Sequence, residues 1–185
     1  MYQSMAVTGY KPYEIGVFNE KHEQLPYLKM AIKKKLTALI EDWDLSWIII
    51  TGQPGVELWT GEAVLELKER YADLHLAVLA PFYGQEERFP EPVKALYEAV
   101  WRQADYKDYI TKRHYENPSQ LRMKNDFVVT KTDALLVLYD EETEGTPKYI
   151  LAPAKKRAEV VDYPIIYITP EDIEDLIREE EQNES

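Results

Sequence analysis

Short apolar runs alternate along the chain with longer stretches in which apolar residues recur every three or four positions. The runs are typical of buried parallel strands, and the longer spacing is typical of amphipathic helices that cover them. Strands are predicted over residues 5–9, 46–51, 74–80, 106–112, 133–139 and 164–168, and helices over residues 26–43, 56–67, 90–104, 118–130, 148–160 and from 170 onward.

The regular alternation of strand and helix predicts the fold class. Right-handed crossovers between successive strands produce a mostly parallel sheet with helices on both faces. We therefore expect a Rossmann-like α/β fold of three layers, α/β/α. No repeat or long linker interrupts the pattern, so residues 1–178 are predicted to form one domain and the acidic residues 179–185 a frayed tail.

The composition excludes several classes of protein. The 185 residues contain no cysteine, which excludes disulfide scaffolds, cysteine zinc sites and thiol nucleophiles. His22, His75 and His114 do not share metal-ligand spacing, so no metal site is predicted. No apolar run approaches the ~20 residues of a membrane span, and residues 1–10 lack the features of a secretory signal. A cytoplasmic protein with no membrane partner is expected.

The formal net charge of −12 narrows the range of ligands. A field of this sign repels phosphate backbones, which makes nucleic acid an unfavourable partner. A small anionic ligand stays compatible with this charge, because a local group of backbone N–H donors can override the global field.

The loops that follow the strands hold the candidate site residues, since ligands of open α/β sheets bind beyond the carboxyl ends of the strands. Between the second strand and the second helix, Gly52 and Gly55 flank a turn that exposes helix N-terminal N–H groups, an arrangement suited to anions. The turn lacks the third glycine of the dinucleotide fingerprint and the end of a P-loop. Glu57 either complements the helix dipole or accepts hydrogen bonds from a ribose or a base, and the pattern does not separate these roles.

Three further loops carry polar or aromatic groups. Thr8 and Lys11 follow the first strand and offer a hydroxyl and a charge. Phe82, in an aromatic pair after the third strand, either stacks against a ring or packs within the loop. Gly145 and Thr146 precede a helix, and the N-terminus of a helix is suited to binding phosphate. The acidic run just before them would repel a phosphate group.

Five strings of the sequence resemble the YpsA family, an uncharacterised protein family of Gram-positive bacteria. The strings are Ala6-Val7-Thr8-Gly9-Tyr10-Lys11-Pro12, Gly52-Gln53-Pro54-Gly55-Val56-Glu57-Leu58-Trp59, Pro81-Phe82-Tyr83, Gln103-Ala104-Asp105-Tyr106, and Leu138-Tyr139-Asp140 with Gly145-Thr146-Pro147-Lys148-Tyr149.

The resemblance implies membership of a Rossmann-like superfamily that includes DprA and the LOG-type phosphoribohydrolases and binds nucleotides or nucleotide-derived ligands. It also implies a regulatory or sensing role linked to bacterial cell division, with a protein partner, and it places Trp59 near the pocket. The loops and the resemblance together give these candidate ligand-binding residues: Thr8, Gly9, Tyr10, Lys11, Gly52, Gln53, Gly55, Glu57, Trp59, Pro81, Phe82, Arg113, Gly145, Thr146 and Lys148.

Three functions follow from these observations. The first is a sensor of a nucleotide-derived ligand of the ADP-ribose or NAD type. The second is a phosphoribohydrolase-like enzyme, with Glu57 as the one candidate catalytic group and Arg113 holding phosphate. The LOG-type enzymes carry the motif P-G-G-x-G-T-x-x-E, whose glutamate takes part in the chemistry. Here the glycine pair is missing, and Tyr149 stands three positions after Thr146, where that glutamate would fall. Both departures disfavour this function. The third is DprA-like binding of single-stranded nucleic acid, which the net charge disfavours.

Four tryptophans and 14 tyrosines exceed what one core of this size needs. They either cover the faces of the sheet or form the contact of a homo-oligomer, for which the helix around Trp101 is the candidate.

Overall fold

The structure is a computed structural model that describes residues 2–17 and 19–184. All six predicted strands are present and form one sheet, in which every pair of neighbouring strands is parallel. The order is β4-β3-β2-β1-β5-β6, and the strands are β1 (Ser4–Gly9), β2 (Trp47–Ile50), β3 (His75–Ala80), β4 (Tyr106–Tyr109), β5 (Ala134–Leu138) and β6 (Ile165–Ile168). The predicted Rossmann-like α/β class is confirmed.

The predicted helices are also present, with ends that differ by a few residues from the expected ones. Two short 3₁₀ helices, η1 (Pro12–Ile15) and η2 (Gln85–Arg88), lie in stretches expected to be loops. The α-helices are α1 (Leu25–Trp43), α2 (Val56–Leu67), α3 (Glu91–Gln103), α4 (Ser119–Lys131), α5 (Lys148–Ala158) and α6 (Pro170–Asn183).

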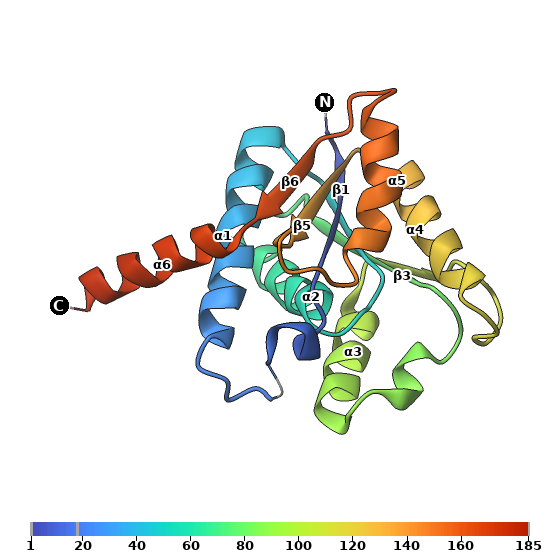
Figure 1. Cartoon of the computed structure of the whole chain (residues 1–185), viewed down its shortest axis with the longest axis horizontal. Helices are drawn as coiled ribbons and strands as arrows, with labels where there is room; N and C mark the ends of the chain where they lie inside the picture. The colour runs from blue at the N-terminus through green and yellow to red at the C-terminus, as the bar shows by residue number, and fades with distance from the viewer. Residues whose placement is uncertain (1, 18, 185) are drawn as a thin grey trace.

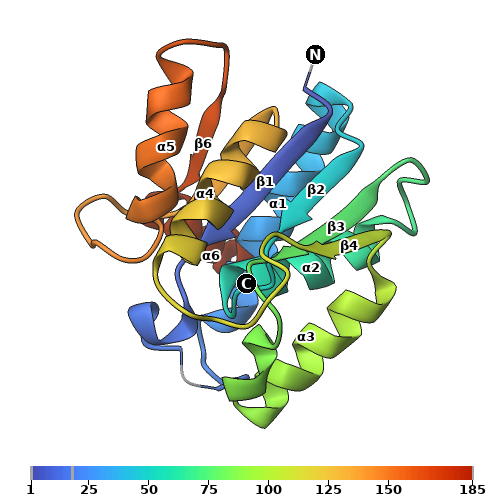
Figure 2. The same ribbon diagram turned by 90° about the vertical axis from the view of Figure 1, so that its right-hand side faces the viewer.

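The helices form two layers, one on each face of the sheet (Figures 1 and 2). From β1 the chain steps outward to β4, and right-handed crossovers place α1, α2 and α3 on one face. The chain then returns to β5 beside β1, so α4 and α5 cover the opposite face and pack against each other. Helix α6 packs against α1 and extends away from the sheet.

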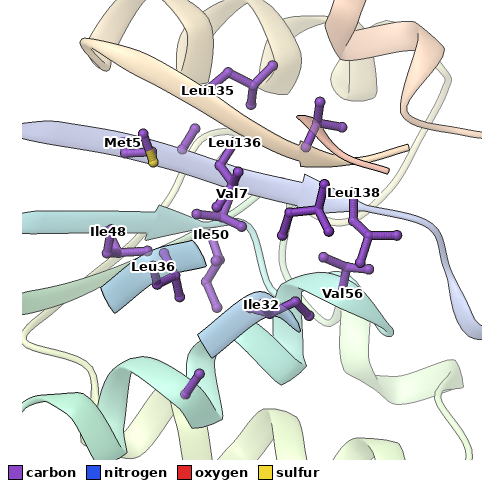
Figure 3. Close-up of a cluster of buried hydrophobic side chains, with 14 of the residues drawn as sticks. Met5, Val7, Ile32, Leu36, Ile48, Ile50, Val56, Leu135, Leu136 and Leu138 are labelled. Carbon is purple, nitrogen blue, oxygen red and sulfur yellow. The ribbon is translucent and has the colours of Figure 1, made fainter. Parts of the chain in front are cut away.

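The core fills the space between the sheet and both helical layers. All five residues of β5 are buried, as expected for a strand that helices cover on both faces. Figure 3 shows Val7 and Leu136 on neighbouring strands, with Ile32 and Leu36 of α1 on one side of the sheet. Burial of this apolar surface is the main force that fixes the strand ends in place.

Several of the aromatic residues pack against one another near β4, at one edge of the sheet. Trp101 stacks on Tyr97 with a centroid separation of 5.9 Å and contacts Tyr109 at 5.2 Å. Trp101 is therefore packed within the chain and only partly exposed. A homo-oligomer stays a prediction.

Helix α6 begins as the sequence predicted. Thr169 is its N-cap and accepts a hydrogen bond from the Asp172 N–H, while the Asp172 carboxylate accepts one from the Thr169 N–H. The helix continues through Asn183, so the structure places most of the expected frayed tail in a helix. Among the described residues, no helix combines the length and apolar character needed to span a bilayer.

The strand order reverses at β1, whose two neighbours are β2 and β5. The crossovers on the two sides of β1 lie on opposite faces of the sheet, so the loops after β1 and β5 separate at this point. Thr8 pairs with Val137 and Gly9 with Leu138, which brings the ends of both strands to the same level. This switch point is where ligands of open α/β sheets bind.

Candidate functional site

A cleft with two lobes opens at the carboxyl edge of the sheet. The larger lobe, of about 650 Å³, lies over the switch point between β1 and β5, and we call it the switch-point lobe. The smaller one, of about 270 Å³, lies toward β2 and β3, and we call it the aromatic lobe. The two lobes meet at four residues that line both of them: Lys11, Gln53, Leu121 and Lys124.

The cleft contains many of the residues proposed from the sequence. Thr8, Thr146 and Lys148 line the switch-point lobe, while Pro81 and Phe82 line the aromatic lobe. The ring of Phe82 lies 5.1 Å from the ring of Tyr115, so the two form an aromatic wall. The expectation that loops far apart in the sequence converge at the carboxyl edge is met for these residues.

Glu57 lies beneath the cleft and joins the ends of two strands. Its Oε1 accepts hydrogen bonds from the N–H of Thr51 at 2.6 Å and from the Thr51 hydroxyl at 2.8 Å. Its Oε2 accepts one from the Thr8 hydroxyl at 2.8 Å. The side chain is 3% exposed, so the protein's own donors occupy this carboxylate. This structural role is a third one, beside the two considered from the sequence.

All four of the proposed glycines make close contacts with the protein itself, and a Cβ at Gly145 would meet the Glu14 carboxylate. Gly55 has φ +89°, and a Cβ there would lie 2.5 Å from the carbonyl oxygen of Tyr10. That carbonyl accepts a hydrogen bond from the N–H of Val56, which fixes the β1 loop against the start of α2. At Gly52 a Cβ would meet the Tyr97 ring at 2.5 Å, and at Gly9 it would meet Val56 at 2.7 Å. These glycines allow the strand ends to pack closely on helices.

The start of α5 holds an anion, as the sequence indicated, but the anion is a side chain of the protein. The Glu14 Oε2 accepts a hydrogen bond from the Thr146 N–H at 2.7 Å, and its Oε1 accepts one from the Thr146 hydroxyl at 2.7 Å. The N–H of Lys11 also donates to Oε1, at 2.8 Å. Glu14 lies in η1, which the sequence did not predict, and its carboxylate occupies the donors that were expected to bind phosphate.

Lys124 on α4 stands where the two lobes meet and is half-buried. Its ammonium group makes no hydrogen bond or ion pair with the described parts of the chain. Burial lowers the pKa of Lys124, the Glu57 carboxylate acts in the opposite direction, and the nearby Lys11 charge lowers it further. Lys124 is thus a cation at the centre of the cleft that forms no ion pair with the described residues.

The pattern of residues along α4 indicates the position of Lys124 only weakly. Gln120, Lys124 and Asn125 lie on one side of α4 at spacings of four and five, a pattern in which polar residues take inward positions. Gln120 and Asn125 are indeed buried, and the Gln120 side chain accepts hydrogen bonds from the N–H groups of Glu116 and Asn117. The buried Gln120 is thus satisfied within the protein, and Lys124 is the residue on this side of α4 that lines the cleft.

Comparison with known proteins identifies the family. A family model for YpsA, described as the YspA SLOG family, matches residues 5–173. The chain belongs to the YpsA family. A UPF0398 protein of Bacillus velezensis is 50% identical over 177 residues, which cover 96% of this chain and 97% of the relative. A UPF0398 protein of Bacillus cereus is 50% identical over 179 residues, 97% of each chain.

The YpsA match covers both lobes of the cleft. Eight of the residues proposed from the sequence line neither lobe: Gly9, Tyr10, Gly52, Gly55, Glu57, Trp59, Arg113 and Gly145. Gly55 and Trp59 line a separate cavity of about 1090 Å³ between the η1 region, α2 and α3, together with Leu58 and Leu96. Arg113 is exposed, and its guanidinium lies 3.8 Å from the Glu116 carboxylate.

Tyr10 has a supporting role in the YpsA cleft. Its hydroxyl accepts a hydrogen bond from the N–H of Asp140 and lies 2.6 Å from the carbonyl oxygen of Thr143. It therefore fastens the loop between β5 and α5 to the loop after β1.

Across residues 2–17 and 19–184, no group of three or more acidic or histidine side chains could hold a metal ion.

The contact between Glu14 and Thr146 leads to a prediction about stability. Replacing Glu14 with alanine leaves two donors of Thr146 and the Lys11 N–H without their acceptor, so we expect a loss of about 1–3 kcal/mol in the free energy of unfolding. Urea denaturation measures this loss. Glu20→Ala removes the same charge from an exposed position and serves as the control. Equal effects of the two substitutions would contradict the structural role of Glu14.

Proposed function

We propose that this YpsA-family protein binds a nucleotide-derived ligand in the two-lobed cleft and acts as a sensor or regulator. The observation that carries the proposal is the position of Lys124 at the junction of the lobes. A half-buried ammonium without an ion-pair partner is costly, and an anionic ligand offsets that cost. Family membership supports the same class of ligand.

The charge around the cleft also supports an anion. Lys11, Arg122, Lys124 and Lys148 line the switch-point lobe, against one acidic residue, Asp126. The protein as a whole carries a net charge of −12, so this cluster departs from the surrounding surface. Such a local excess of positive charge attracts a small phosphate-bearing ligand without making the protein a general binder of nucleic acid.

The order of groups along the cleft favours a ligand with its phosphates in the middle. The aromatic lobe offers Phe82 and Tyr115 as a wall against which a base can stack. The junction offers Lys11 and Lys124, and the switch-point lobe has hydroxyl and amide groups suited to a sugar. A nucleotide bridged by a pyrophosphate, such as ADP-ribose or NAD, has its groups in this order, and a mononucleotide fills one lobe only.

We do not extend the proposal to hydrolysis of a glycosidic bond. A general base needs a free oxygen within roughly 2.6–3.2 Å of the proton it takes, or one water away. Glu57 is buried, and both of its oxygens already accept hydrogen bonds from Thr8 and Thr51. Binding therefore accounts for the site better than catalysis does.

A thermal-shift series tests the proposed ligand class. We expect ADP-ribose and NAD to raise the melting temperature more than ADP, and ADP more than AMP or ribose 5-phosphate, because only the longer ligands reach both lobes. A ligand at 100 times its dissociation constant adds about 2.7 kcal/mol to the free energy of unfolding. No shift from any of these compounds at millimolar concentration would overturn the proposal, as would an equal shift from inorganic pyrophosphate alone.

A further inference from the structure

We infer that Glu57 is a positioning residue for Lys124, whose ammonium it keeps charged and directed at the junction of the two lobes. The inference rests on the proposed function, since it takes Lys124 as the cation that meets the ligand's phosphates. It assigns Glu57 a role that involves no contact with the ligand and no proton transfer.

The geometry of Glu57 suits this role. Three hydrogen bonds from Thr8 and Thr51 hold its carboxylate rigidly at the ends of β1 and β2. A small cavity of about 10 Å³ lies beside the carboxylate. Its polar lining residues are Thr8, Thr51, Glu57, Lys124 and Asn125. The cavity has about the volume that one buried water requires, and its lining provides the polar partners that such a water needs. The carboxylate and Lys124 thus border one small polar cavity without forming an ion pair, and the Glu57 charge acts on the ammonium through this cavity.

The charges that face Lys124 come from four parts of the chain. Glu57 approaches from α2 and Lys11 from the loop after β1. Arg122 and Asp126 border the same lobe from α4 itself, and Lys148 borders it from the start of α5. Burial lowers the pKa of Lys124, Glu57 raises it, and Lys11 lowers it. Glu57 is therefore the group that offsets burial and the neighbouring cation.

A negative charge is required for this role, whereas a hydrogen-bond acceptor alone is sufficient to join the two strands. Glutamine at position 57 keeps an oxygen for Thr51 but removes the charge that faces Lys124. The pKa of Lys124 would then fall further below its ordinary value, and the ammonium would lose its proton at a lower pH. As the pH rises, the variant would therefore lose its affinity for an anion at a lower pH than the wild type does.

The first experiment measures the pKa of Lys124 directly, by ¹³Cε NMR titration of the lysine side chains, with Lys124→Arg identifying the resonance. We expect Glu57→Gln to lower this pKa, because the negative charge that favours the ammonium is removed. Lys11→Gln should raise it, because a neighbouring like charge is removed. Thr8→Val removes one anchor of the carboxylate but keeps its charge, so its effect should be much smaller.

Equal shifts in Thr8→Val and Glu57→Gln would overturn the inference, because a purely structural role predicts that result. An unchanged pKa in Glu57→Gln would also overturn it. If Glu57→Gln does not fold, Glu57→Asp replaces it, since aspartate keeps the charge on a shorter side chain. The expected fall in the pKa of Lys124 is then smaller and in the same direction, and no fall would overturn the inference.

The second experiment measures the affinity for ADP-ribose as a function of pH. In Glu57→Gln the affinity should fall about tenfold at a pH where the wild type still binds, and it should recover at lower pH. The double variant Glu57→Gln with Lys124→Arg should keep its affinity across this range, because arginine stays protonated. If the wild type binds and the Glu57→Gln profile matches it, the inference fails while the proposed function stands. If the wild type does not bind at any pH, the proposed function fails instead.

Discussion

Replacing Lys124 with glutamine should weaken the binding of ADP-ribose by about 10- to 100-fold, which is the loss expected for about 1.5–3 kcal/mol of charge-assisted hydrogen bonding. The free protein should lose little stability, because the substitution removes a half-buried charge that forms no ion pair. Isothermal titration calorimetry at constant pH and ionic strength measures the first quantity, and urea denaturation measures the second.

Lys131→Gln is the matched control for this substitution. Lys131 lies at the end of the same helix, α4, is exposed, and places its ammonium over the ring of Phe127 outside the cleft. Its replacement removes the same charge from the protein and should leave the affinity unchanged. Equal losses in the two variants would mean that net charge, and not the position of Lys124, governs binding.

Replacing Gly55 with alanine should destabilise the protein by about 2–5 kcal/mol, as the sum of backbone strain and overpacking. The residue has φ +89°, and the new Cβ would lie 2.5 Å from the backbone oxygen of Tyr10, which cannot move without displacing the loop after β1. Urea denaturation of the free protein measures this loss, and no ligand is needed to observe it.

Gly16→Ala provides a comparison in which the backbone is strained but no clash arises. Gly16 has φ +72°, and nothing lies within 4 Å of the position that its Cβ would take. Its replacement should cost about 1–2 kcal/mol, the penalty for a left-handed backbone alone. If Gly55→Ala is no more destabilising than Gly16→Ala but abolishes binding, Gly55 faces the ligand, as the sequence alone indicated.

The strands and helices could be predicted because each one carries its own pattern. The run from Ala134 to Leu138 is apolar throughout, and the structure buries it completely. The start of α6 at residue 170 was predictable for the same reason, since Thr169 as the N-cap and Pro170 at the first helical position act locally. The 3₁₀ helix η1 was missed because four residues do not establish a periodicity.

The candidate site was predictable only in part, because its decisive contacts join distant parts of the chain. The loops after the strands were correctly placed at one edge, a consequence of parallel topology. That the Thr146 donors are satisfied by Glu14, 132 positions away, depends on how η1 packs and has no signature in either segment. Lys124 was missed because a lysine on a surface helix is usually exposed to solvent.

The central claim is that a nucleotide-derived ligand occupies the cleft at the switch point. Chemical-shift mapping of backbone amides during titration with ADP-ribose tests it most directly. The account predicts shifts that saturate together and are concentrated around Thr8, Gln53, Lys124 and Thr146, which line the cleft. Shifts centred on Trp59 and Leu96, which line the other large cavity, or no shifts at millimolar ligand, would contradict it.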